Sequence, residues 1–525
     1  MPRDPEIARE AGRRRTFAII SHPDAGKTTL TEQLLLLGGA VREAGAVRAR
    51  KAQRHATSDW LEIERQRGIS VSSSVMYFDH AGFRVNILDT PGHRDFSEDT
   101  YRALVAADSA VMLIDAAKGI EAQTRKLFEV CRLRGIPIFT FVNKMDRVGR
   151  EPLALIDEIE EVLGIEAAPA QWPVGAGDTF RGLYDRVGER LLLFASEDGS
   201  ALEEVPGAID APPVRKAMGP AAGAVADALA LLDGAGGRFD PAAVQEGRQT
   251  PVFFGSALRG RGVAPFLERF LELAPAPGPR PSDRGPIEPA EHPFSGFVFK
   301  IQANMDPSHR DRIAFLRVCS GRFVRGETAL HEPSGTRIRM ARSTLFQARE
   351  REEVDEAWPG DVVGLFDPGI FRIGDTLSET GGFAYQPLPT FSPERFAKVE
   401  LGEVSNRKAL AKGLTQLTQE GLVQRFEEPG TGMAVILGAV GELQFDVLRH
   451  RMKTEYRIDL RLAPLPFEIA RWPAGELDPE VFRYHEGVKI LADREGRPVL
   501  LFRSPWELQH AEEKHPGLRL SPTPS

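Results

Sequence analysis

The feature that most constrains the fold of this 525-residue chain is a loop between an apolar run and an amphipathic stretch. Residues 16–20 have the composition of a buried strand, and residues 28–37 have the spacing of a helix. The loop resembles the pattern G-x-x-x-x-G-K-[ST], whose backbone N–H groups bind phosphate at a helix N-terminus. A serine replaces the first glycine of that pattern. The loop residues are Ser21, His22, Pro23, Asp24, Ala25, Gly26, Lys27 and Thr28.

The end of this loop carries the groups that a nucleoside triphosphate requires. Gly26 has no side chain, so the backbone can approach the phosphates closely. The N–H groups of residues 24–28 would surround the β-phosphate. Lys27 would reach the β- and γ-phosphate oxygens, and the Thr28 hydroxyl would bind Mg²⁺. The alternative is an ordinary strand–turn–helix with a surface lysine.

A second motif follows the apolar run 85–88 and consists of Asp89, Thr90, Pro91, Gly92 and His93. The Asp89 carboxylate could hold Mg²⁺ through water. Gly92 could donate its N–H to the γ-phosphate and turn away when that phosphate leaves. His93 is placed to contact the attacking water. The alternative is a strand that ends in a Pro-Gly turn.

A third motif follows the run 138–142 and predicts the base. An aspartate can accept hydrogen bonds from guanine N1–H and the exocyclic amine, a pair of donors that adenine lacks, so Asp146 would select GTP. Asn143 could bond the base edge, and the stem of Lys144 could cover its face. After a later strand at 251–254, a backbone N–H of the tripeptide 255–257 could bond guanine O6. The residues of these two motifs are Asn143, Lys144, Met145, Asp146, Ser256 and Ala257.

Between the first two motifs lies Arg67-Gly68-Ile69-Ser70. The Ser70 hydroxyl could complete the Mg²⁺ shell and sense the γ-phosphate, which would close the loop at about 42–74. The alternative is a polar loop before a strand. The loop also holds seven Lys and Arg residues between 42 and 67, which could contact RNA or form a solvated mixed-charge segment.

The pattern along the chain predicts several domains, since 525 residues are too many for one core. Apolar runs at 16–20, 85–88, 110–114 and 138–142 alternate with helical stretches from 15 to 145, which indicates a parallel sheet wrapped by helices. We expect a GTP-binding domain at 10–280 with an inserted subdomain at about 150–248. Within it, the Ala-, Gly- and Pro-rich stretch 206–237 is expected to be loosely ordered in parts. The proline-rich stretch 274–293 is expected to be a stiff, exposed linker.

The C-terminal half has a different pattern of apolar and turn-forming residues. Short β-rich runs separated by turn residues predict a small antiparallel β-barrel at 290–383. Helical and strand patterns mix again from 387 to 525, which predicts an α+β domain. The predicted fold is therefore an α/β P-loop GTPase domain with an inserted subdomain, followed by an antiparallel β-barrel and an α+β domain.

The overall composition limits the cellular location and the classes of partner that we expect for this protein. The net charge of −8 does not suit a general nucleic-acid binder. No stretch approaches the roughly 20 apolar residues that span a bilayer, and residues 1–15 lack a secretory apolar core. We therefore expect a cytoplasmic protein without membrane contact, and nothing demands more than a monomer. Cys131 and Cys319 are expected to be buried, reduced thiols.

Four motifs together resemble those of the translational GTPases: residues 21–28, Arg67-Gly68-Ile69-Ser70, residues 89–93 and residues 143–146. Further segments resemble one branch of them, the bacterial class II peptide chain release factors. These segments are Ser58-Asp59-Trp60, Asp95-Phe96-Ser97-Glu98-Asp99-Thr100-Tyr101-Arg102, Ile114-Asp115-Ala116-Ala117-Lys118-Gly119 and Gly438-Ala439-Val440-Gly441-Glu442-Leu443-Gln444-Phe445-Asp446-Val447. Ser21, in place of glycine or alanine, and Pro23, in place of an aliphatic residue, depart from the general pattern but fit this branch.

The resemblance implies a GTP-hydrolysing termination factor that binds GTP or GDP with Mg²⁺. It would act on the ribosome, through rRNA and ribosomal proteins, to promote departure of the codon-reading release factors after peptide release. By resemblance, His93 would orient the hydrolytic water and Ser70 would fill the Mg²⁺ position usually held by threonine. An elongation-type or ribosome-protection GTPase is the alternative, although such factors carry further domains. A non-hydrolysing regulatory protein and a metabolic GTPase with a barrel are more distant alternatives.

Overall fold

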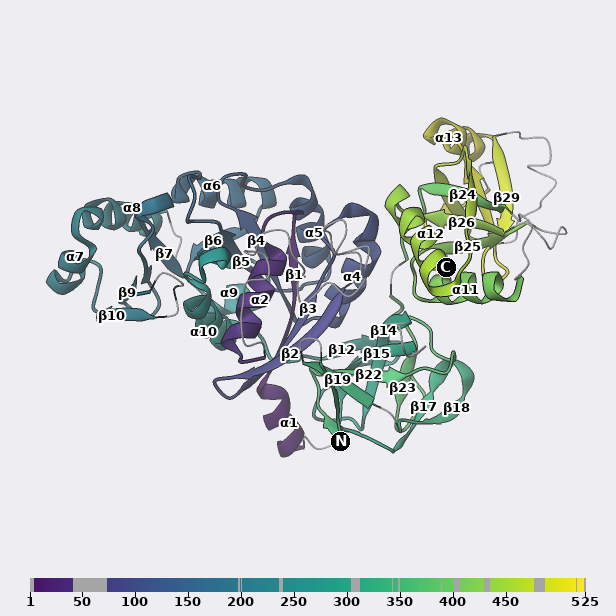
Figure 1. The fold of residues 1–525 in the computed structure, drawn as a ribbon, viewed down its shortest axis with the longest axis horizontal. Coiled ribbons are helices and arrows are strands. Elements are labelled where there is room, and N and C mark those ends of the chain that lie inside the picture. The colour runs from purple at the N-terminus through teal and green to yellow at the C-terminus, as the bar shows by residue number, and fades with distance from the viewer. Residues whose placement is uncertain are drawn as a thin grey trace.

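The computed structural model describes residues 4–40, 73–196, 199, 201–235, 239–303, 312–341, 343–347, 350–388, 390–400, 407–428, 435–475, 487–515 and 517–523. Within these residues the strands form one seven-stranded, mainly parallel sheet and several antiparallel sheets, arranged along the chain as Figure 1 shows. The predicted order of an α/β domain, an antiparallel β domain and an α+β domain is confirmed.

The seven-stranded sheet has the order β2-β3-β1-β4-β5-β11-β6. All neighbours are parallel except β2, which pairs antiparallel with β3. The five apolar runs predicted as strands in this part of the chain are all present. The strands are β1 Arg14–Ser21, β2 Ser74–His80, β3 Phe83–Asp89, β4 Ser109–Asp115, β5 Ile138–Asn143, β6 Glu166–Pro169 and β11 Gln249–Phe254.

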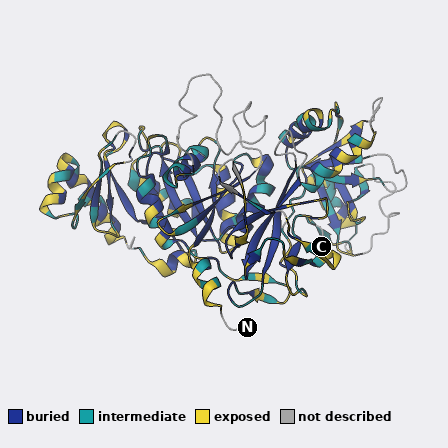
Figure 2. Cartoon of the chain, turned by 60° about the horizontal axis from the view of Figure 1, so that its bottom comes forward, coloured by how far each residue is buried: buried dark blue, intermediate teal, exposed yellow. Residues whose placement is uncertain are grey.

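Helices cover both faces of this sheet because its central strands are buried on both sides (Figure 2). Alternate residues of β1 belong to different cores: Ala18 and Ile20 to one, Phe17 and Ile19 to the other. The first core includes residues of α4, α5 and α6, and the second includes residues of α2 and α10. These helices are α2 Lys27–Leu37, α4 Ser97–Ala106, α5 Ala122–Leu133, α6 Pro152–Leu163 and α10 Val263–Leu273; α1 Pro5–Gly12 precedes β1.

A separate four-stranded antiparallel sheet, ordered β10-β9-β8-β7, lies within the region expected to be an insert. Its strands are β7 Gln171–Val174, β8 Gly182–Asp185, β9 Arg190–Phe194 and β10 Leu202–Pro206. The preceding elements α6 and β6 belong to the main sheet and its core, although they fall inside 150–248.

The stretch 206–237 is more regular than expected. It forms α7 Pro212–Met218 and α8 Ala222–Gly234, and α9 Pro241–Gln245 follows. Alanine is the strongest helix former, and Val225, Leu229 and Leu232 repeat at intervals of three and four, so one face of α8 is buried. The Ala-rich composition therefore marks a helix with one buried face in this stretch.

The expectation of an exposed linker at 274–293 is wrong. Strands β12 Arg280–Ser282 and β13 Gly285–Ile287 form a hairpin, and Ala274, Ile287 and Ala290 are buried. Arg280 donates to the backbone oxygens of Val105 and Ala107 at 2.8 and 2.7 Å. Because these partners lie at the end of α4, far away in sequence, composition alone does not reveal them.

The barrel region is a curled antiparallel sheet of eight strands, ordered β18-β17-β23-β14-β15-β22-β19-β20. Val298, Leu316 and Val363 belong to its core. The strands are β14 Ser295–Ala303, β15 Arg312–Ser320, β17 Thr328–His331, β18 Thr336–Arg339, β19 Ser343–Gln347, β20 Glu350–Glu353, β22 Val362–Phe366 and β23 Thr376–Ser378, beside the short pair β16 Phe323–Val324 and β21 Glu356–Ala357.

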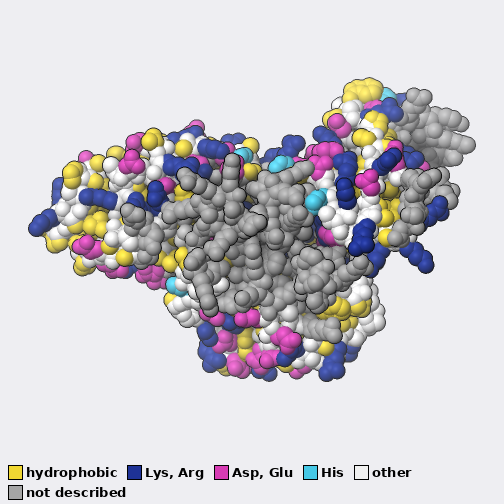
Figure 3. Space-filling view, viewed as in Figure 1, with side chains coloured by type: hydrophobic (Ala, Val, Ile, Leu, Met, Phe, Trp, Pro, Cys, Tyr) yellow, Lys and Arg dark blue, Asp and Glu magenta, His cyan; other side chains and the backbone are white. Residues whose placement is uncertain are grey.

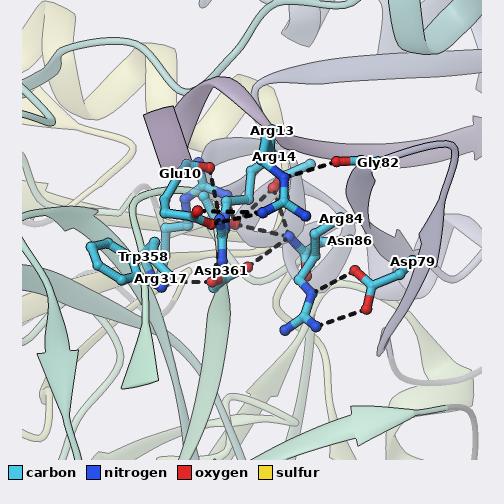
Figure 4. Close-up of polar contacts among 12 residues, drawn as sticks. Glu10, Arg13, Arg14, Asp79, Gly82, Arg84, Asn86, Arg317, Trp358 and Asp361 are labelled. Atoms are coloured by element: carbon cyan, nitrogen blue, oxygen red, sulfur yellow. Dashed lines mark hydrogen bonds and ion pairs between the residues drawn. The ribbon is translucent and has the colours of Figure 1, made fainter. Parts of the chain in front are cut away.

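A buried polar network joins this sheet to the first domain (Figure 4). The carboxylate of Asp361, just before β22, accepts from Arg14 Nε at 3.1 Å. Arg14 also donates to Glu10 of α1 at 2.6 Å. Asn86 of β3 donates to Asp361 at 3.4 Å, and Thr16 of β1 donates to Gly360 O at 2.7 Å. The turn at residues 358–361 is therefore held by two strands of the parallel sheet and by α1.

In its described residues, the last region, from residue 390 onward, combines an eight-stranded antiparallel sheet with three helices; we call it the C-terminal unit. The strand order is β27-β24-β26-β25-β29-β30-β28-β31. The strands are β24 Arg395–Glu400, β25 Gln424–Glu427, β26 Val435–Ala439, β27 Arg461–Leu465, β28 Ile469–Pro473, β29 Val488–Ala492, β30 Pro498–Phe502 and β31 Leu520–Ser521; the helices are α11 Arg407–Gln419, α12 Glu442–Tyr456 and α13 Pro505–Lys514.

Both cysteines are buried and free, as expected. Burial raises the pKa of the Cys131 thiol to about 12. Among the described helices, none combines the length and apolar character needed to cross a membrane. Basic and acidic side chains are interspersed over the described part of the face in Figure 3.

Candidate functional site

The loop between β1 and α2 needs glycine at position 26 for two separate reasons. Gly26 has φ +99°, a left-handed conformation that L side chains rarely adopt. A Cβ atom at this position would also lie 2.4 Å from Nδ2 of Asn143. Asp24 is left-handed too, with φ +67°. The loop therefore turns sharply so that α2 begins at Lys27.

Lys27 joins the first two motifs. Its Nζ lies 2.5 Å from Oδ1 of Asp89, and both residues are buried. Asp89 ends β3, which is paired in parallel with β1, so the two motifs meet at the carboxyl edge of the sheet. This is the edge at which open α/β sheets bind ligands.

The rest of the second motif also lies against the first. Thr90 Oγ1 donates to Ile19 O of β1 at 2.6 Å, and a Cβ atom built at Gly92 would lie 3.5 Å from Cα of Pro23. His93 caps the short 3₁₀ helix η1 Arg94–Phe96, and its Nδ1 accepts from Asp95 N at 3.2 Å. The His93 side chain is 38% exposed.

Asn143 has a different position from the one expected. It is buried, and its amide donates to Ala25 O at 2.8 Å and accepts from Ala257 N at 2.8 Å. Both ends of the amide therefore contact backbone, and the side chain ties the phosphate loop to the late tripeptide 255–257. These two hydrogen bonds support the phosphate loop and could not be predicted from the sequence.

Lys144 also braces the phosphate loop. It has φ +68°, and its Nζ donates to Asp24 O at 2.6 Å and to Asp115 Oδ2 at 2.7 Å. Burial would raise the pKa of Asp115, but the hydrogen bonds from Lys144 and from the N–H of Ala117 outweigh it, so that the pKa is lowered. The predicted site residues do not include Asp115. Its position at the end of β4, at the same sheet edge, was the signal that could have found it.

Three of the predicted nucleotide-binding residues carry buried polar atoms without a hydrogen-bond partner in the described part of the chain. These atoms are Ser21 Oγ, His22 Nδ1 and Asp146 Oδ1. An unsatisfied buried polar atom costs about 1–3 kcal/mol, so such atoms gather where a ligand completes them. Oδ1 of Asp146 is a carboxylate oxygen suited to the N–H donors of guanine.

The tripeptide 255–257 has no spare backbone N–H for guanine O6 in this structure. Gly255 N donates to Val142 O at 2.9 Å, Ser256 N to Arg261 O at 2.8 Å, and Ala257 N to the Asn143 amide. A contact of these N–H groups with the base would require one of the bonds to be exchanged. Met145, the remaining predicted residue, is buried, and its N–H donates to Gly255 O.

One pair at the site was missed altogether. His22 Nε2 lies 3.2 Å from the carboxylate of Glu121, which precedes α5. Ser70 lies outside the described residues. The same holds for the rest of the predicted loop up to residue 72, including its basic residues. Of the predicted Mg²⁺ ligands, Thr28 stands at the N-terminus of α2 next to Lys27, whose amine reaches Asp89.

Models of known protein families match nearly the whole chain. The "Elongation factor Tu GTP binding domain" matches residues 12–276, "Elongation factor G domain 2" matches 293–380, and "Class II release factor RF3, C-terminal domain" matches 385–512. Guanine-nucleotide binding therefore belongs to residues 12–276, which contain every predicted nucleotide-binding residue.

Curated relatives are similar from end to end. Proteins named peptide chain release factor 3 from Gloeobacter violaceus and Symbiobacterium thermophilum are 53% and 54% identical to this chain, each over 98% of both chains. A crystal structure of a protein from Thermus thermophilus superposes with a TM-score of 0.69 at 24% identity, over 89% of this chain and 71% of that one. At that identity the superposition shows a shared fold alone.

Proposed function

Since the chain belongs to the peptide chain release factor 3 family of translational GTPases, we propose that it hydrolyses GTP on the ribosome and thereby promotes departure of the codon-reading release factors after peptide release. The proposed partners are the ribosome, through rRNA and ribosomal proteins, and those release factors, in the cytoplasm. The match of residues 385–512 to a release-factor domain favours termination over an elongation-type role.

The observation that carries the nucleotide assignment is the convergence of the ends of β1, β3 and β5 on one site. Lys27 contacts Asp89, Asn143 contacts Ala25, and Lys144 contacts Asp24. Asp146 follows with an unpartnered buried carboxylate oxygen. We assign guanine to Asp146, and the phosphates to the loop 21–28 and to Lys27, whose amine would exchange Asp89 for phosphate oxygens.

The residues present fit a magnesium ion. A hydroxyl at Thr28 and a buried carboxylate at Asp89 are the oxygen ligands that Mg²⁺ prefers, with Ser70 as a third from outside the described residues. The ion would neutralise charge that develops on the phosphates. In this structure the Asp89 carboxylate is held by Lys27, whose Nζ lies 2.5 Å from Oδ1.

His93 is the residue we assign to the attacking water. The bond from Asp95 N makes Nδ1 an acceptor, so that a neutral ring carries its proton on Nε2, the nitrogen that can contact water. The ring is partly exposed beside Gly92, whose neighbour Pro23 belongs to the phosphate loop. Positioning of water and stabilisation of charge supply most of the rate in phosphoryl transfer.

Substitution of His93 by alanine tests this assignment. We expect ribosome-stimulated GTP turnover to fall about 10²-fold or more, the loss expected when the attacking water is misplaced, while the Kd for GTP changes little. The matched control is His80→Ala, because His80 ends β2 at its hairpin with β3, at the sheet edge opposite Asp89. Equal turnover in the two variants would refute the role of His93.

The action on terminated ribosomes needs a separate measurement. Departure of a labelled codon-reading release factor from ribosomes after peptide release should be faster with this protein and GTP than with GDP. If the departure rate is unchanged while GTP is still hydrolysed, the GTPase assignment stands and the termination role does not.

A further inference from the structure

The turn that carries His93 is held by the C-terminal unit. Oδ2 of Asp95 accepts from Leu443 N, in the first turn of α12, at 2.9 Å. Asp95 is only 4% exposed. The first N–H groups of a helix have no acceptor within the helix, and its N-terminus carries partial positive charge, so a carboxylate is stabilised there.

The approach of Asp95 to α12 depends on a glycine. A Cβ atom built at Gly441, the N-cap of α12, would lie 2.0 Å from Cγ of Asp95. The backbone of Gly441 is extended, with φ −146° and ψ 165°, a conformation open to any residue. Glycine is therefore required here by proximity alone.

Asp95 completes the cap of α12 that the helix lacks on its own. Gln444 accepts from Val440 N and Gly441 N at 2.7 and 3.2 Å. Leu443 N is left to Asp95, a residue 348 positions away in the chain. A carboxylate from the turn that carries His93 thus supplies the missing acceptor.

Apolar packing reinforces this contact. Phe96 and Val447 are buried together in a small cluster, with Leu422 and Leu443 packed against it. Farther along α4, Arg102 lies close to Gly421. A Cβ atom built at Gly421 would lie 2.2 Å from Nη1 of Arg102. A cavity of about 60 Å³ lies at this junction, with side chains from α4, β14 and α12 in its wall.

The same residue holds the histidine from the other side. Asp95 N donates to His93 Nδ1 at 3.2 Å, and Asp95 Oδ1 lies 3.4 Å from that nitrogen. The ring of His93 also meets Phe96 edge-on, with 6.3 Å between centroids. A continuous set of contacts therefore runs from α12 through Asp95 and Phe96 to His93.

We propose that Asp95 is a positioning residue through which α12 restrains His93 and keeps GTP hydrolysis by the free factor slow. Movement of Gly92 toward a γ-phosphate must shift η1, and this shift loosens the bond from Leu443 N to Asp95. A partner that moves the C-terminal unit away from η1 removes the restraint. By thermodynamic linkage, nucleotide-driven movement of η1 also weakens the docking of α12. The inference rests on the proposed role of His93.

The test is Gly441→Ala, which alters the C-terminal unit and leaves every nucleotide-binding residue intact. We expect the ribosome-independent turnover of GTP to rise about 5-fold or more, which corresponds to about 1 kcal/mol in the activation free energy. The amide of Leu443 should exchange hydrogen faster. The matched control is Gly223→Ala in α8, where an added Cβ meets nothing within 4 Å, and its turnover and exchange should equal those of the unaltered protein.

Two further variants assign the effect. In a His93→Ala background, Gly441→Ala should no longer raise turnover, since the released group is absent. Asp95→Asn keeps the size of the side chain and removes its charge, so it should give a smaller rise and serves if Gly441→Ala fails to fold. Unchanged or lower turnover despite faster exchange at Leu443, or a rise that survives His93→Ala, would overturn the proposal. Absence of hydrolysis by the unaltered protein even with ribosomes would instead defeat the proposed function.

Discussion

Asn143 and Asp146 stand three residues apart in one motif, yet their side chains have different kinds of partner. The Asn143 amide donates to Ala25 O and accepts from Ala257 N, while Oδ1 of Asp146 is buried without a partner in the described part of the chain. Asn143 thus supports the shape of the site, and Asp146 is left to recognise the base. Residue type alone did not separate these two roles.

Substitution of Asp146 by asparagine should change the preferred base. An amide cannot accept both donors of guanine, so we expect the affinity for GTP to fall at least about 10-fold, because a hydrogen bond to a charged group contributes about 1.5–3 kcal/mol. Xanthosine triphosphate carries a carbonyl oxygen in place of the exocyclic amine and should gain affinity. Competition binding of the two nucleotides measures this, with Asp157→Asn on the exposed face of α6 as the control. An unchanged preference would contradict the assignment of guanine to Asp146.

At the scale of the element, the loop from β1 to α2 owes its shape to contacts from three other strand ends. Asp89, at the end of β3, contacts Lys27, and Asn143, at the end of β5, contacts Ala25. Asp115, at the end of β4, acts through Lys144, which follows β5 and donates to Asp24 O. A loop braced in this way is partly preorganised, because contacts that already fix its backbone reduce the cost of ordering it when a ligand binds.

Substitution of Gly26 by alanine should abolish nucleotide binding, because strain at φ +99° combines with a 2.4 Å approach to Asn143. Gly39→Ala is the matched control: Gly39 is also left-handed, with φ +69°, but has open space around its Cα. We expect Gly39→Ala to cost about 1 kcal/mol of stability and to bind GTP normally. Thermal unfolding and GTP binding of both variants separate strain from collision. Normal GTP binding by Gly26→Ala would show that the loop tolerates displacement.

At the scale of the whole molecule, the parallel sheet and the barrel are joined through buried charge. Asp361 is bonded to Arg14, to Asn86 and to the N–H of Trp358 (Figure 4). Arg317 of β15 donates to Gly360 O and pairs with Asp108 at 2.6 Å. The C-terminal unit instead meets the first domain at η1 and α4, next to the proposed catalytic histidine.

Asp361→Asn should destabilise the junction between sheet and barrel by about 3 kcal/mol. This value is at the lower end of the range for removing one partner of a buried ion pair, because Glu10 still contacts Arg14. Denaturant unfolding followed by the fluorescence of the adjacent Trp358 measures this. Asp79→Asn is the control, since Asp79 also pairs with an arginine, Arg84, but is 59% exposed and should contribute less than about 1 kcal/mol. Equal effects of the two substitutions would show that the junction does not depend on Asp361.

The elements that sequence predicted well are those with a local cause. Buried parallel strands are continuous apolar runs, so β1, β3, β4, β5 and β11 were found within a few residues. The elements that it missed depend on distant partners. The hairpin β12–β13 is held by Arg280 at the end of α4, and α8 is ordered by a sheet that precedes it.

The sequence by itself determined the class of ligand, the order of the motifs and the family, because phosphate and guanine recognition require particular residue types at fixed spacing beside strand ends. Only the tertiary structure decided how those motifs are braced. Asn143, Asp115 and Glu121 acquire their roles from residues 29 to 118 positions away, and Asp95 meets Leu443 across 348. Such contacts depend on how strands and domains pack, and no local pattern in the chain encodes them.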